Sequence, residues 1–267
     1  MGAQRLAGRA RLTVLIAILF GAAIGVAVGT LGGGGSVLAV PVLVYLLGED
    51  LPDATTAGLA VVGAGALAGA ARHALAGRVC WRHAVSFTVA ALPGIALGTL
   101  AGEAVSDELL LIALALVLLA AARSVWRRGE QGAPDGDPAA DSCPPLRLPR
   151  DAMAGIGVGF LTGFLGVGGG FLIVPTLAVG LAFTLRTAVG TSLAIITATS
   201  ALSLAAHLAA GRAVDVPITT AMALACAAGA VAGAAASGRI PQRALGRGFA
   251  ALVVAVAGGL LVSALAA

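Results

Sequence analysis

The sequence has little charge. Only 10% of its 267 residues are Asp, Glu, Lys or Arg, whereas a soluble domain carries about 25%. Hydrophobic residues make up 59% of the chain, and the mean hydropathy is +1.03. Several stretches without a charged residue approach or exceed the roughly 20 residues that cross a bilayer as a helix; they are 12–47, 54–71, 109–122, 152–185, 187–206 and 216–238. These features predict an all-α integral membrane protein.

Aromatic residues and cysteines are also scarce. Aromatics make up 4% of the chain, and the arginines behind the sequence pI of about 9.8 are scattered over short loops. This pattern is typical of arginines that fix membrane orientation, and it predicts no nucleic-acid partner. The three cysteines, Cys80, Cys143 and Cys226, have neither metal-like spacing nor evident disulfide partners. The sequence therefore predicts no metal site and no cofactor.

Carboxylates are missing from the predicted spans. Cation-coupled carriers usually bury Asp or Glu to hold the cation, so their absence favours an anionic substrate. The spans also contain no Ser/His/Asp set. The chain is therefore not expected to be an enzyme.

What the chain does contain is an internal repeat at an offset of 134 residues. GVAVGTLGGGGSVLAVPVLV at 25–44 returns as GFLTGFLGVGGGFLIVPTLA at 159–178, with ten of twenty positions identical. The correspondence extends over 21–126 and 155–260, which points to duplication of one unit. We therefore predict a first transmembrane repeat at 1–126, a polar cytoplasmic linker at 127–150 and a second repeat at 151–267. Since residues 21–44 have a counterpart deep in the chain, the first segment is read as a retained span.

Each repeat is predicted to hold about four transmembrane helices and one Gly-rich broken or re-entrant segment. The piece 36–48 is only about 20 Å long as a helix, too short to span alone. With the N-terminus inside and eight crossings, every loop of the first half obeys the positive-inside rule. The second half fits less well, because Arg239, Arg243 and Arg247 would lie outside. With the N-terminus inside, ten crossings with inverted halves would place the linker outside, so eight crossings are preferred.

The doubled Gly-rich breaks are the strongest functional signal. Irregular backbone at membrane depth survives only where it is packed in protein or lines a wet cavity, and paired breaks in two repeats point to a transporter's substrate site. The short helix after each break offers unpaired N–H groups to an anion. The outer glycines of each Gly-x-x-x-Gly series, at 21/25/29 and 155/159/163, are instead typical of close helix packing. A nucleotide-binding loop is excluded, because neither break ends in Gly-Lys-Ser/Thr.

Other repeat-paired residues lie near the spans. His73 and His207 could relay protons, although a position at the cytoplasmic interface is an equally good interpretation. Arg78 and Arg212 either anchor the interface or attract anions. Thr191 and Ser192 could add hydroxyl ligands to the site.

At this point the sequence resembles the TauE/SafE sulfite exporter family, also called the toluene-sulfonate uptake permeases. The resemblance rests on two copies of Gly-x-Gly-Gly-Gly followed by Pro-x-Leu, and on Val-Gly-Thr-Ser-Leu at 189–193. It implies substrate-binding roles for the motif residues and for Ser36, which replaces the last glycine of the first copy; these residues are Gly32, Gly34, Gly35, Ser36, Pro41, Gly166, Gly168, Gly169, Gly170, Pro175, Gly190, Thr191 and Ser192.

The resemblance also implies a multi-pass protein of the bacterial inner membrane that moves sulfite, sulfonates or small carboxylate anions, driven by the proton-motive force. We therefore expect a secondary transporter, with export as the favoured direction. A passive anion channel and a non-transporting membrane subunit remain alternatives. The expected partners are a small anion and the lipid bilayer, and assembly of identical chains is compatible with the sequence.

Overall fold

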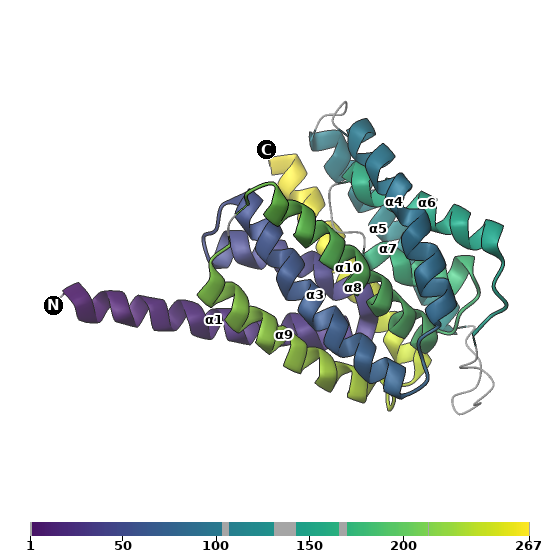
Figure 1. Cartoon of the computed structure of the whole chain (residues 1–267), viewed down its shortest axis with the longest axis horizontal. Coiled ribbons are helices and arrows are strands. Elements are labelled where there is room, and N and C mark those ends of the chain that lie inside the picture. The colour runs from purple at the N-terminus through teal and green to yellow at the C-terminus, as the bar shows by residue number, and fades with distance from the viewer. Residues whose placement is uncertain (1, 103–106, 131–142, 166–169, 213, 267) are drawn as a thin grey trace.

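The computed structural model describes residues 2–102, 107–130, 143–165, 170–212 and 214–266, and within these ranges all regular structure is helical. Figure 1 shows a bundle from which the N-terminal part of α1 projects. The elements, in chain order, are α1 (Gly2–Leu31), η1 (Gly32–Leu38), α2 (Ala39–Pro41), η2 (Val42–Leu46), α3 (Leu51–Leu75), α4 (Trp81–Gly102), α5 (Asp107–Glu130), α6 (Leu148–Leu165), α7 (Gly170–Pro175), η4 (Thr176–Gly180), α8 (Leu185–Ala209), α9 (Val216–Ser237) and α10 (Gln242–Ala266).

Five of these helices are long and apolar enough to cross a membrane: the stretches are Val14–Leu31, Asp53–Leu75, Trp81–Ala101, Leu185–Ala209 and Val216–Ser237. Their outward faces carry large apolar side chains such as Leu100, which is 67% exposed, and Leu224, which is 68% exposed. Such faces suit lipid rather than water. The chain is an all-helical membrane protein, as the composition predicts.

The helices interlock through glycine. Gly25 of α1 lies against the Cys226 carbonyl of α9, and Gly159 of α6 lies against the Ala91 carbonyl of α4, with no room for a Cβ at either glycine. Without a hydrophobic driving force in lipid, small residues of this kind let backbones approach closely. The packing role predicted for the outer glycines is confirmed.

The directions of the helices follow from these contacts. Along α9, Cys226 meets Gly25 of α1 and Gly65 of α3, and four residues later Ala230 meets Gly29 and Gly69. Helices α1 and α3 therefore both run parallel to α9, and so in the same direction as each other. The intervening segment, η1 to η2, must return to the end of the bundle where α3 begins.

This geometry contradicts the eight-crossing arrangement preferred from charge. That arrangement needs α1 and α3 to run in opposite directions, with the broken segment entering and leaving on one side. Instead Gly58, near the start of α3, faces Ala39, Val40 and Leu43 of the broken segment. The segment thus runs the length of α3 in the opposite direction.

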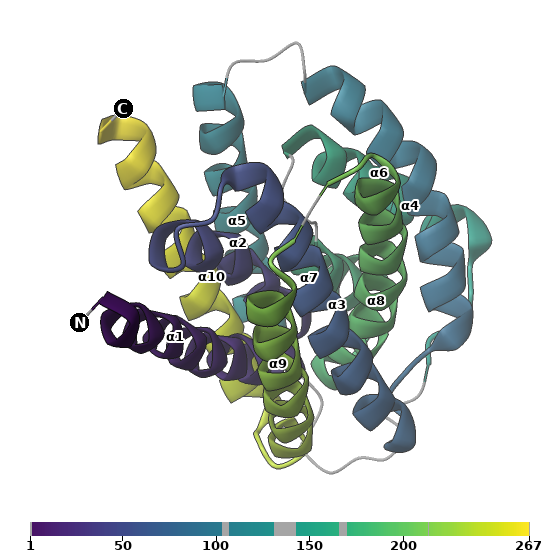
Figure 2. The ribbon, with the colours of Figure 1, turned by 60° about the vertical axis from the view of Figure 1, so that its left-hand side comes forward.

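Equivalent helices of the two halves run antiparallel where they meet. Helix α3 packs along α8 with Thr56 beside His207, Gly63 beside Ser200 and Gly69 beside Leu193. At the offset of 134, the first and last positions of α3 correspond to those of α8, and each helix has 25 residues. Figure 2 shows α3 and α8 in the middle of the bundle, with α4 and α6 along one side.

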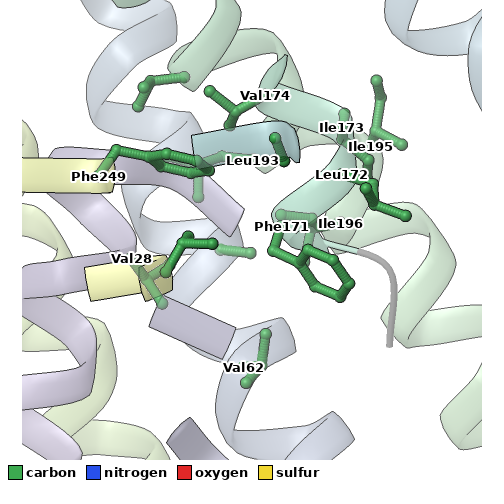
Figure 3. Close-up of a cluster of buried hydrophobic side chains, with 14 of the residues drawn as sticks. Val28, Val62, Phe171, Leu172, Ile173, Val174, Leu193, Ile195, Ile196 and Phe249 are labelled. Atoms are coloured by element: carbon green, nitrogen blue, oxygen red, sulfur yellow. The ribbon is translucent and has the colours of Figure 1, made fainter. Parts of the chain in front are cut away.

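The centre of the bundle is built around α7. All six of its residues are buried. Figure 3 shows Phe171, Leu172, Ile173 and Val174 among side chains of α1, α3, α8 and α10, and Phe171 is 1% exposed. A broken segment of this apolarity is therefore enclosed by protein, as irregular backbone at membrane depth must be.

The expectation that the cysteines lack disulfide partners is wrong. Cys80, before α4, and Cys143, before α6, form a disulfide with their Cα atoms 5.8 Å apart. Their separation of 63 residues gives no sequence signal, because only the packing of α4 beside α6 brings them together. Cys226 is a buried free thiol in α9.

Candidate functional site

The two Gly-rich segments meet each other. Gly33 in η1 lies so close to Gly170, the first residue of α7, that a Cβ on Gly33 would overlap the Gly170 carbonyl oxygen. A Cβ on Gly170 would lie 2.8 Å from Ser36 Oγ, and one on Gly32 would lie 2.7 Å from Ser192 Oγ. Four of the predicted site residues, Gly32, Ser36, Gly170 and Ser192, are thus brought together around Gly33.

Gly32 ends helix α1. Its φ of +72° lies in the left-handed region that glycine adopts without a steric penalty. The turn directs the chain into the 3₁₀ segment η1 (Gly32–Leu38) and away from the axis of α1. Substituting a residue with a side chain would strain this turn as well as meet Ser192.

His73 lies at the same junction. Its Nε2 is 3.1 Å from the Gly29 carbonyl oxygen, in the last turns of α1, and the residue is 1% exposed. Because a carbonyl only accepts, Nε2 carries the hydrogen and donates it. Nδ1 has no hydrogen-bond partner among the described residues. His73 is thus buried against the first break rather than placed at an aqueous interface.

The paired His207 is held differently. Its Nδ1 is 2.9 Å from Thr56 Oγ1, and the residue is half-buried. The position equivalent to Thr56 in the second half is Gly190, which lies against the Cβ of His73 and the carbonyl of Arg78. Each histidine therefore contacts the opposite half, and among the described residues His73 also bonds to the end of α1 that precedes the first break.

Thr191 and Ser192 are fully buried in the first half of α8. The Thr191 hydroxyl oxygen accepts a hydrogen bond from the Cys80 backbone N–H at 3.0 Å, and the Ser192 hydroxyl donates to the Val189 carbonyl at 2.8 Å. The Ser36 hydroxyl likewise donates to the Gly33 carbonyl at 2.6 Å. In this conformation all three hydroxyl groups form hydrogen bonds with backbone groups.

The remaining predicted residues are placed as follows. Pro41 and Pro175 end α2 and α7, and each is followed by a five-residue π-helical segment, η2 or η4. Pro41 is exposed and Pro175 is buried. Gly34 and Gly35 lie within η1. The other three predicted glycines, Gly166, Gly168 and Gly169, lie outside the described residues.

Beside the contact between the two Gly-rich segments is a cavity of about 80 Å³, which lies between α3, α4, α6, α7 and α8. It begins next to Gly170, since Ile196 contacts Gly170 and the preceding Ile195 lines the cavity. Four hydroxyl residues that the sequence analysis did not single out line it: Thr162, Thr199, Ser200 and Ser203. Their signal was the Thr-Ala-Thr-Ser-Ala-Leu-Ser run at 197–203, which puts several hydroxyls in the middle of a span.

No charged side chain is among the residues that line the cavity. Arg212 is exposed in the loop after α8, and Arg78 is half-buried with its guanidinium beside Gly238, at the end of α9. The uncharged span predicted from residue 152 is preceded by a buried carboxylate, because Asp151 in the first turn of α6 is 1% exposed. The sequence analysis missed it because it lies one residue before the uncharged run that begins at 152.

Known proteins resemble this chain over most of its length. The model of the family described as Sulfite exporter TauE/SafE matches residues 17–260. Two relatives, each described as a probable membrane transporter protein, come from Xylella fastidiosa strains 9a5c and Temecula1. Each is 36% identical over 183 residues, which cover 68% of this chain and 69% of the relative. No solved structure matches the chain.

Proposed function

Because the chain belongs to the Sulfite exporter TauE/SafE family and is a membrane transporter, we propose that it is a secondary transporter of small oxyanions such as sulfite and sulfonates. We further propose that it acts in the bacterial inner membrane and is driven by the proton-motive force. The family and the relatives point to a transporter rather than an enzyme.

The proposal rests on the cavity with four hydroxyl residues in its lining, which lies beside the contact between the two Gly-rich segments. Its volume of about 80 Å³ equals that of two to three waters at roughly 30 Å³ each, which suits a small oxyanion. Hydroxyls can donate hydrogen bonds to anionic oxygens, and Ser200 and Ser203 of α8 both line the cavity. Because no arginine or lysine is among the residues that line the cavity, we expect the anion to bind weakly and to be released readily.

The arrangement of the helices supports alternating access between two inverted repeats. Equivalent helices α3 and α8 run antiparallel, and α1 with α9 mirrors α6 with α4. Inverted repeats of this kind let the two halves exchange conformations, which opens a central site first to one side and then to the other. The tight contact of Gly33 with Gly170 is then part of the interface between the two halves that rearranges during transport.

We propose ten crossings, with the broken segments counted as the second and seventh, and with the linker in the cytoplasm. This orientation puts twelve of the sixteen arginines inside, among them Arg239, Arg243 and Arg247. The exceptions are the three arginines near the N-terminus, which then lies outside, and Arg212. In a reducing cytoplasm Cys80 and Cys143 would be thiols rather than a disulfide.

The experiment is flux of labelled sulfite into proteoliposomes, with sulfate, a sulfonate and acetate as competitors and with an imposed pH gradient. We expect saturable uptake that follows the gradient and is inhibited by the sulfonate. Linear, gradient-independent flux would identify a passive channel instead. No movement of any of these anions would refute the substrate class.

A further inference from the structure

A buried acid–base pair lies between α4 and α6, outside the residues that line the cavity. Nε2 of His83 is 3.6 Å from Oδ1 of Asp151, and the two side chains are 4% and 2% exposed. His83 lies in the first turn of α4 and Asp151 in the first turn of α6. Helices α4 and α6 lie side by side in both views (Figures 1 and 2).

The two carboxylate oxygens of Asp151 have different surroundings. Oδ2 accepts a hydrogen bond from the Arg147 backbone N–H at 3.1 Å, whereas Oδ1 has no hydrogen-bond partner within the described residues. The distance of 3.6 Å to His83 exceeds hydrogen-bond length. Phe183, before α8, places its ring edge-on to the imidazole with the centroids 5.0 Å apart. A buried carboxylate oxygen is therefore aimed at a histidine without being satisfied by it.

The pair lies on the faces of α4 and α6 that lead to the hydroxyl cavity. Phe87, four residues after His83, and Val158, seven residues after Asp151, both line the cavity. At 1.5 Å per residue these separations are about 6 and 10 Å along the helix axes. The pair thus lies at the linker-side end of the same helix pair that walls the cavity.

Packing of the fold does not require the pair. Helices α1 and α9 interlock through glycines in the same way as α6 and α4. At the offset of 134, Asp151 corresponds to Ala17 and His83 corresponds to Pro217. One half of the molecule therefore achieves this packing without an acid–base pair, and the other half has one in addition.

We propose that His83 and Asp151 form the proton-binding site that couples anion movement to the pH gradient, which rests on the proposed transport function. A proton binds Nε2 of His83, and the carboxylate of Asp151 holds the resulting imidazolium. The loaded pair is neutral, whereas the empty pair carries one negative charge. Roughly 10 Å from the cavity, in a protein of low polarity, that charge weakens anion binding on the order of tenfold.

The charged groups around the histidine fit this role. Burial of the imidazole opposes its charged form, as does Arg82 from its own helix, and the Asp151 carboxylate, from α6, favours it. The segment before α8 contributes Phe183, which does not titrate. Arg147 and Arg150, at the start of α6, are exposed. One carboxylate therefore decides whether the proton is held.

The test uses the full chain in proteoliposomes with labelled sulfite as the probe, and compares two modes of transport. Gradient-driven accumulation needs coupling, whereas exchange of sulfite at equal pH on both sides does not. Asp151→Asn keeps an oxygen for the Arg147 N–H and removes the charge, and His83→Gln removes the titratable ring. We expect both variants to lose accumulation at least tenfold. Asp151→Asn should keep exchange within twofold, whereas His83→Gln, which leaves the Asp151 charge in place, should also weaken sulfite binding.

The matched control is Asp215→Asn, the same chemical change at an exposed N-cap, where Oδ1 accepts from the Ile218 N–H at 3.0 Å. It should leave both modes unchanged. If Asp151→Asn retains accumulation, or loses exchange to the same degree as accumulation, the coupling role is refuted.

A second measurement tests the pair without relying on sulfite. The chain has three histidines, so nitrogen NMR of the protein in lipid can follow each imidazole, with His83 assigned by its loss in His83→Gln. We expect His83 to gain a proton as the pH is lowered over the range in which the gradient drives accumulation, and that change to shift in Asp151→Asn but not in Asp215→Asn. A His83 signal that is constant over this range, or indifferent to Asp151→Asn, would overturn the proposal. A native protein that moves no sulfite would refute the substrate class alone.

Discussion

The contact between the two breaks predicts a strong effect of a very small substitution. Gly33→Ala adds one methyl group where a Cβ would overlap the Gly170 carbonyl oxygen, a backbone atom that cannot rotate away. Both segments are enclosed by α1, α8 and α7, so relief requires the two halves to separate. Overpacking of this kind costs about 1–3 kcal/mol, which lowers the population of the packed conformation by a factor of about 5 to 150.

The matched control is Gly157→Ala, because Gly157 lies mid-helix in α6 with open space where its Cβ would be. Both variants would be quantified in the membrane and compared for sulfite flux per molecule of protein. We expect Gly33→Ala to reach the membrane and to lose flux by at least fivefold, and Gly157→Ala to retain it. If Gly33→Ala transports sulfite as fast as the control, the contact between Gly33 and Gly170 takes no part in transport.

Three further predictions follow from other parts of the molecule. Ser200→Ala removes one hydroxyl from the cavity and should raise the KM for sulfite about two- to tenfold, the value of one hydrogen bond; an unchanged KM would remove Ser200 from the site. Burial raises the pKa of Glu49 above its usual 4.5, as do Asp215 and Asp53. Because the folded state binds this proton more tightly, it is favoured at low pH and loses this contribution as the pH rises. Glu49→Gln should therefore raise Tm at pH 7 and leave Tm unchanged at pH 4. Equal changes in Tm at the two pH values would contradict this prediction. Cys143 is exposed and, once its disulfide with Cys80 is reduced, should react with a membrane-impermeant maleimide only after the membrane is opened. Labelling of the reduced protein from outside an intact membrane would reverse the orientation.

Patterns that depend on single helices were predictable from the sequence. The long uncharged stretches gave the spans, and the spacing of Gly21, Gly25 and Gly29 gave a packing face that α9 fills. The repeat offset located the equivalent ends of α1 and α6, at Leu31 and Leu165, because glycines that break a helix act locally. That the breaks lie against each other follows only from how α1, α7 and α8 pack.

Features that depend on contacts between distant segments were not predictable. Charge favoured eight crossings because arginines report only the side of a loop, and a segment as short as 36–48 was taken to be unable to span. Helix directions came from packing, above all from Gly29 and Gly69 meeting at Ala230. The partner of His83, Asp151, is 68 residues away in the chain. Two such residues carry no joint signal in one sequence.

The central claim is that anions cross because the two halves move relative to each other, and a reversible lock between α3 and α8 tests it most directly. A Cβ on Gly63 would lie 3.2 Å from the Ser200 Cβ, close to the 3.5–4.5 Å of a disulfide. The variant would carry Gly63→Cys and Ser200→Cys in a chain whose three native cysteines are replaced, with each single cysteine as control. We predict that oxidation stops sulfite flux in the double variant only and that reduction restores it. Undiminished flux with the lock closed would contradict alternating access between the halves.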